Sequence, residues 1–134
     1  MKKMEKLFNG VSICGGIAGG FLCYHLGGWD VLLKTMVALT VLDYITGLTK
    51  AIKNRALSSE TGFIGLLKKI MIFVVIATAF WIQNLVGNAV PLREIVIMFY
   101  ICNEALSLLE NAAEFVPIPE KLRNVLIQLR DKNE

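Results

Sequence analysis

The chain has 134 residues, of which 55% are hydrophobic and 19% are charged, and its formal net charge is +3. Ordinary soluble domains are less apolar and more charged, so the composition indicates an integral membrane protein with a single domain over residues 1–134. The charges gather in short blocks, which argues against the broad basic surface of a nucleic-acid-binding protein.

The first apolar stretch covers about residues 7–27 and follows three lysines. It is too long for the core of a signal peptide and has no small-x-small cleavage site, so we expect a membrane-spanning helix. Small residues let helix backbones approach closely in lipid. We therefore expect helix packing, within the chain or between subunits, at four glycines: Gly15, Gly16, Gly19 and Gly20.

A second apolar stretch covers residues 31–49 and has Asp43 near its centre. A carboxylate at the middle of a bilayer costs about 2.5–3.5 kcal/mol on insertion scales, so it should face protein or water rather than lipid. Helical spacing places Gly47 on the same face. Two roles stay open for this face: a structural hydrogen bond to a neighbouring helix, or the lining of a pore.

Basic residues gather between the second and third apolar stretches, over residues 50–69. Short loops rich in lysine and arginine stay in the cytoplasm, so we expect a cytoplasmic loop there and both termini on the same side of the membrane. Within this segment, Ser58 and Glu60 predict the start of a helix. The residues that determine the topology are Lys50, Lys53, Arg55, Lys68 and Lys69.

The residues from Ile70 to Leu92 carry no formal charge. About 20 residues are needed to cross about 30 Å of hydrocarbon. The sequence therefore predicts a third spanning helix over about residues 70–90.

The fourth apolar stretch, about residues 94–110, has a polar side. The polar residues recur at steps of three and four, which is the spacing of a helix face. Such a helix either spans the membrane with this face shielded from lipid or lies in the interface. The residues proposed to line a pore or bond another helix are Tyr100, Asn103, Glu104, Ser107, Glu110 and Asn111.

The tail, residues 117–134, begins with Pro117 and Pro119, which interrupt the preceding helix. Its apolar side chains share one side, and it is too charged to insert, so we expect an amphipathic helix on the membrane or on a sister subunit. The predicted fold is an all-α integral membrane protein with three to four transmembrane helices and this short C-terminal amphipathic helix.

Catalytic chemistry is not indicated. The chain has one histidine, and its three cysteines fall in apolar stretches without metal-ligand spacing. Neither a nucleophile–base set nor a phosphate-binding glycine loop can be assembled from these residues. We expect no enzymatic activity, no cofactor and no metal.

Four motifs resemble those of the toxin-secretion/phage-lysis holins, in the same order and over about residues 31–129. Val116 departs from the pattern, because the family has a Gly-Val pair there. The motifs are DYITG at 43–47, LSSETG at 57–62, FYICNEALS at 99–107 and PIP at 117–119. The resemblance implies that six residues belong to the family's motifs: Asp43, Gly47, Glu104, Ser107, Glu110 and Asn111.

The resemblance implies a protein that oligomerises in the cytoplasmic membrane of a bacterial host. There it would open lesions through which an endolysin or a secreted toxin crosses, and an antiholin is a further partner. Two alternatives stay open. A small proton-coupled transporter also has four short spans, but its carboxylate lies in the first helix, where this chain has none. An antiholin that restrains a holin would share the same motifs.

Overall fold

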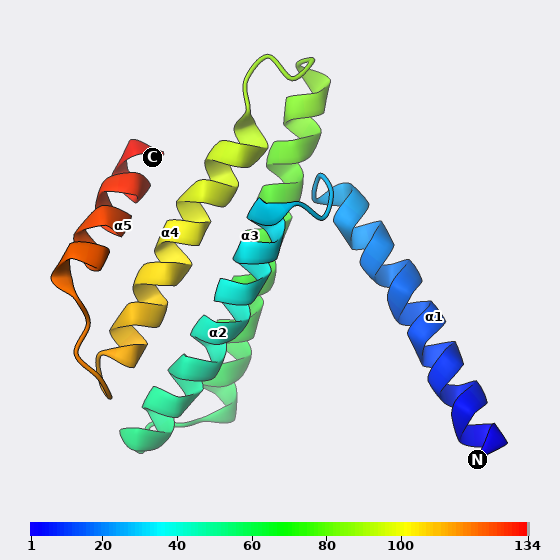
Figure 1. The fold of residues 1–134 in the computed structure, drawn as a ribbon, viewed down its shortest axis with the longest axis horizontal. Helices are drawn as coiled ribbons and strands as arrows, with labels where there is room; N and C mark the ends of the chain where they lie inside the picture. Colours follow the sequence, from blue (N-terminus) through cyan, green and yellow to red (C-terminus); the bar gives the residue numbers. More distant parts are fainter. Residues whose placement is uncertain (134) are drawn as a thin grey trace.

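The computed structural model describes residues 1–133, and this part of the chain folds into helices without strands (Figure 1). This confirms the all-α prediction. Three helices, α1 to α3, are long and apolar enough to cross a membrane. The helices are α1 (Lys2–His25), α2 (Val31–Lys53), α3 (Ser59–Leu85), α4 (Leu92–Ala112) and α5 (Glu120–Lys132).

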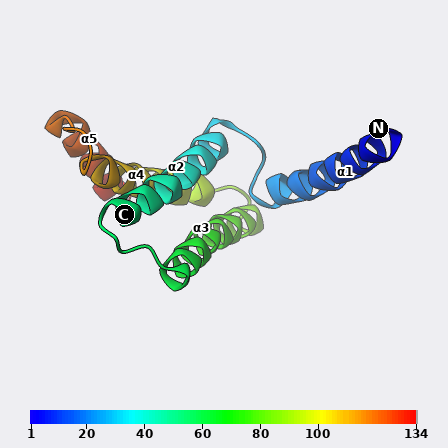
Figure 2. The same ribbon diagram turned by 90° about the horizontal axis from the view of Figure 1, so that it is seen from below.

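Helices α2, α3 and α4 pack side by side into a bundle, in which α2 and α4 run in the same direction and α3 runs opposite to both (Figures 1 and 2). The core cluster consists of Met36 from α2, Ile76 from α3, and Ile97 and Ile101 from α4. In lipid, such a core gains little from the hydrophobic effect, because lipid tails are equally apolar. Close van der Waals packing and polar bonds hold the helices together instead.

Helix α3 begins at Ser59, well before the expected span near residue 70, because the hydroxyl of Ser58 accepts a hydrogen bond from the backbone of Thr61 at 3.1 Å. This confirms the predicted helix start. It also corrects the expected loop over 50–69, since α2 continues to Lys53 and only residues 54–58 connect the two helices.

Helix α1 projects away from the bundle and touches α3 near the junction (Figures 1 and 2). At this junction the ring of His25 packs edge-on against that of Trp81, with centroids 5.7 Å apart. Within the described part of the chain, no atom of another helix lies within 4 Å of a Cβ atom built at Gly15, Gly16, Gly19 or Gly20. Packing between subunits at these glycines stays a prediction.

Helix α5 turns back after Pro117 and Pro119 and packs antiparallel along α4, on the side of the bundle away from α1 (Figure 1). The expected tail on the membrane surface or on a sister subunit is therefore wrong for this structure. An apolar side of α4 receives α5 within the same chain, as Cys102 and Leu106 of α4 are buried there. Glu134, the last residue of the tail, lies outside the described residues.

Candidate functional site

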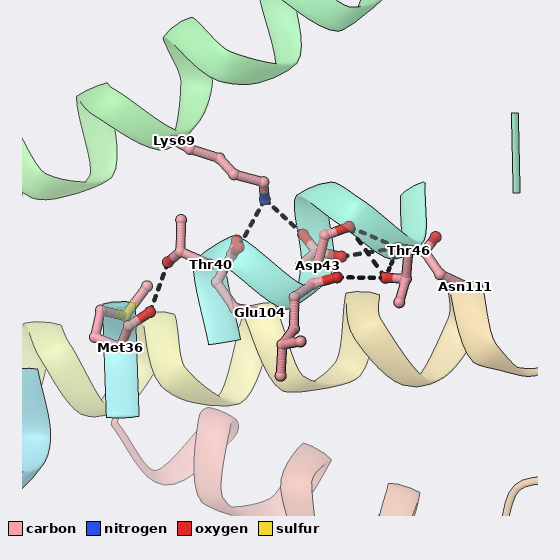
Figure 3. Close-up of polar contacts among 8 residues, drawn as sticks. Met36, Thr40, Asp43, Thr46, Lys69, Glu104 and Asn111 are labelled. Carbon is pink, nitrogen blue, oxygen red and sulfur yellow. Dashed lines mark hydrogen bonds and ion pairs between the residues drawn. The ribbon is translucent and has the colours of Figure 1, made fainter. Parts of the chain in front are cut away.

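A buried ion cluster joins the three helices of the bundle (Figure 3). The Nζ atom of Lys69, on α3, donates to Oδ2 of Asp43 on α2 at 2.5 Å and to Oε2 of Glu104 on α4 at 2.7 Å. The Asp43 and Glu104 side chains are only 6% and 8% exposed. Asp43 thus faces protein, as expected from the cost of exposing a carboxylate to lipid.

Asn111 extends this cluster toward the end of α4 (Figure 3). Its amide donates to the side chain and backbone carbonyl of Asp43, at 2.9 and 3.2 Å, and to the hydroxyl of Thr46 at 3.1 Å. Gly47 leaves room for this approach, because a Cβ atom there would lie 3.6 Å from the Asn111 nitrogen. Asp43 and Gly47 were expected on one face of α2. They therefore meet Glu104 and Asn111, which were expected on one face of α4.

One ammonium faces two carboxylates in this cluster, so negative charge is in excess when both acids are ionised. Burying charge is costly, and a buried ion pair recovers that cost only through good geometry and further hydrogen bonds. Asp43 has such a bond from Asn111. The arrangement can cross-link helices, and it can take up a proton, which would remove the excess charge.

A cleft of about 260 Å³ leads from the cluster toward the connection over residues 54–58. Its walls include small residues of α2 and α3, and beside it the phenol of Tyr44 donates to the backbone carbonyl of Gly62 at 3.1 Å. The cleft also contains Ser107. The residues that line it include Asp43, Gly47, Gly62, Gly65, Lys69, Ser107 and Asn111.

The remaining polar residues expected on α4 lie outside this site. Tyr100 packs against the core cluster, and Asn103 is half-buried elsewhere on the helix. Glu110 lines a separate cavity of about 320 Å³ between α4 and α5. The expected polar face thus divides, and Glu104, Ser107 and Asn111 are the part that reaches the ion cluster or its cleft.

The basic residues expected to set the topology also divide. Lys50 and Lys53 pair with Glu114 at the end of α4, at 3.8 and 3.5 Å. Arg55 lies in the short connection and Lys68 is exposed on α3. Lys69 lies on the bundle side of α3, because the early start of that helix brings it level with Asp43. Whether these residues determine the topology stays a prediction.

A second buried cation, Arg93, was missed by the sequence analysis. Its guanidinium donates to both carboxylate oxygens of Asp30, at 2.8 and 3.1 Å, and to the carbonyl of Leu26 at 2.5 Å. It therefore joins the start of α4 to the α1–α2 connection. Gly27 has a φ of +89°, and a Cβ atom there would lie 2.3 Å from the guanidinium. A Gly-Gly pair followed by an acid, with one arginine between two uncharged stretches, was the available signal.

The hydrogen bond from Arg93 lowers the pKa of the Asp30 carboxyl below its usual value. Partial burial acts in the opposite direction, and a bond from the backbone N–H of Leu33 adds to the lowering. Asp30 also caps α2 through this last bond, which is 2.9 Å long. The junction is thus most stable while this side chain is ionised.

Residues 20–131 match the model of the bacteriophage holin family. The chain is 38% identical over 131 residues to an uncharacterized protein in the nagH 3′ region of Clostridium perfringens, covering 96% of this chain and 99% of that protein. It is 33% identical over 111 residues to a probable holin of Bacillus phage phi105, covering 82% of each chain. No solved structure matches it.

Proposed function

The chain belongs to the bacteriophage holin family, and from this membership we propose that it oligomerises in the cytoplasmic membrane of a bacterial host and opens lesions there. The membership confirms the resemblance noted in the sequence, and the family is not one of enzymes. The cargo that we propose to cross the lesion is an endolysin or a secreted toxin. The observation that carries the proposal is the match over residues 20–131, which includes all of α2 to α4 and all but the last residue of α5.

The burial of charge within one chain supports the proposal. The carboxylates of α2 and α4 are covered by Lys69 of the same chain, so a single copy can enter lipid and accumulate without exposing them to hydrocarbon. Helices α1 to α3 supply three apolar lengths sufficient to span the membrane. Accumulation before assembly is what a protein that opens lesions at a set time requires.

We also propose that the N-terminus and the connection over 54–58 face the cytoplasm. Both lie at the lower end of the molecule in Figure 1, and both carry basic residues, which favour the cytoplasmic side.

Expression in a bacterial host tests the proposed function. With a cytoplasmic muralytic enzyme present, induction of the chain should give abrupt loss of membrane potential followed by lysis. Without the enzyme, the potential should collapse while the cell wall stays intact. Cells that contain the enzyme alone are the control and should not lyse.

The same experiment separates the alternatives. An antiholin would leave the membrane potential intact and would delay lysis by a co-expressed holin. A proton-coupled transporter would release no large solute from lipid vesicles, whereas a holin should release trapped dextran without an ion gradient. Either of these results would contradict the proposed function.

A further inference from the structure

Helix α5 has exposed charged side chains toward both of its ends, at residues 120–123 and 130–132. In 13 residues it has four basic and two acidic side chains, and most of these are exposed. They are Glu120, Lys121, Arg123, Arg130, Asp131 and Lys132.

Helix α4 lies at the same depth as α2, because polar bonds join the two helices near both ends. Asp30, immediately before α2, bonds Arg93 at the start of α4. Lys53, at the end of α2, bonds the backbone carbonyl of Glu114 just after α4 at 2.5 Å. With 21 residues, α4 is about 31 Å long, close to the thickness of the hydrocarbon layer. If α2 spans the membrane, α4 must span it as well.

Helix α5 in turn lies at the depth of α4. Its first residues, Glu120 and Arg123, share a cavity with Leu109 near the end of α4. Asn133, just after α5, lies beside Ile95 and Phe99 in the first turns of α4. The charged helix therefore runs along most of a membrane-spanning helix rather than beyond its end.

A charged side chain facing lipid at this depth costs about 2.5–3.5 kcal/mol near the bilayer centre. Several such residues on one helix cannot be stable there against hydrocarbon. We propose that α5, docked on α4, lines the water-filled lumen of the lesion with its exposed charged side chains. This inference rests on the proposed function, since it requires an assembly that encloses water.

The rest of the molecule agrees with this arrangement. The exposed side chains of α3 are uncharged over residues 70–85 and most are apolar, for example Ile70, Met71 and Val74, so this surface is suited to lipid. On α4, the side under α5 contains Cys102, which is fully buried. Each copy would thus present apolar helices outward and α5 inward, and the lumen would be bordered by α5 of successive copies.

A reversible cross-link between α4 and α5 tests the docked state. Helix α5 packs on α4, in which Cys102 is fully buried, so Arg130→Cys is introduced in a C14S/C23S background, and only protein in which mass spectrometry shows the two thiols joined by a disulfide is tested as the oxidised form. The purified protein is placed in phosphatidylethanolamine–phosphatidylglycerol vesicles that contain dextran. We expect the oxidised protein to release dextran as well as the reduced protein. A variant that also carries C102S controls for oxidation alone.

A bulky label tests whether the lumen borders α5. In a variant without native cysteines, a polymer attached at Gln128→Cys, on the exposed side of α5, should reduce the size of the largest dextran released. The matched control is Asn54→Cys, which is also exposed but lies at the end of the bundle. The polymer attached there should leave the released size unchanged.

Two results would overturn the inference: oxidised protein that retains dextran and releases it on reduction, or a polymer at Gln128 that has no more effect than one at Asn54. Reduced, unlabelled protein that releases no dextran would instead contradict the proposed function.

Discussion

Lys69 and Arg93 lie in the same bundle, and each pairs with a carboxylate supplied by α2 or the residue before it. Arg93 donates to two carboxylate oxygens and to backbone carbonyls, and the Asp30 side chain is 46% exposed. Lys69 lies between two carboxylates that are almost fully buried. At the junction, Arg93 pairs with Asp30 and also lies 3.7 Å from Glu94, and both of these acids are about half-exposed to solvent. The two acids of the ion cluster are instead almost fully buried.

Because of this difference, removal of Lys69 should destabilise the bundle more than removal of Arg93. When Arg93 is removed, the partner left behind can be hydrated. When Lys69 is removed, two acids stay buried and must repel each other or take up protons. The junction therefore serves mainly to connect helices. The ion cluster is the part of the bundle whose stability depends most on charge.

The largest effect is expected for Lys69→Met. Removing one partner of a buried ion pair typically costs about 3–5 kcal/mol, so the free energy of unfolding of the bundle should fall by about that amount. Denaturant unfolding in detergent, followed by circular dichroism, measures it. The neighbouring Lys68→Met is the control, because Lys68 is exposed, and it should have little effect.

The triple variant D43L/E104L/K69M sharpens this prediction. Apolar replacement of a whole buried ionic group is often neutral or stabilising, so the triple variant should recover most of the stability lost in K69M. If it folds and inserts but does not lyse cells, the carboxylates act in lesion formation as well as in folding. A triple variant as unstable as K69M would contradict the account of unpaired buried charge.

A smaller loss is expected for Arg93→Met. Hydrogen bonds to charged groups contribute about 1.5–3 kcal/mol each, but Asp30 is close to water and recovers part of this, so the loss should be smaller than for K69M. The same unfolding experiment measures it, with the exposed Arg55→Met as control. If R93M were as damaging as K69M, the proposed contrast between the two sites would be wrong.

The smallest expected effect is on the pH dependence of the free energy of unfolding in acid. Arg93 lowers the pKa of Asp30 in the folded chain, so the stability gained from this ionised side chain is fully present above the unfolded pKa of about 3.9. It is lost as the pH falls through the lower folded pKa. Asp30→Asn keeps a residue able to cap α2 and should flatten this part of the pH dependence. The wild-type minus D30N difference in unfolding free energy, measured between pH 6 and 3, checks it; an unchanged slope would contradict the role of Asp30.

Much of the bundle could be predicted from residue spacing. The cost of a carboxylate in lipid predicted that Asp43 faces protein or water, and the three- and four-residue steps placed Glu104 and Asn111 on one face of α4. The cap at Ser58 was also predicted correctly. These features depend on local geometry, which the order of residues determines directly.

The partners of the charges could not be predicted in the same way. Lys69 follows Lys68 at the edge of an uncharged stretch, and the positive-inside rule treats both as loop residues. The predicted helix start at Ser58 already includes Lys69 in the helix, but only the packed bundle shows that this side of α3 faces Asp43 and Glu104. No partner for Arg93 could be predicted, because its acceptors lie more than sixty positions away in the chain, and contacts at such separations depend on tertiary packing.

The bonds near both ends of α2 and α4 fix the number of residues that α4 can have between Arg93 and Glu114. One residue inserted within α4 would advance its lower half by about 1.5 Å and rotate it by about 100°, so Arg93 and Glu114 could not both meet their partners. Among residues 1–133, the first half of α1 makes no such bond to another helix. Insertions and deletions should therefore be tolerated among natural variants in the N-terminal arm and be rare in the fourth helix.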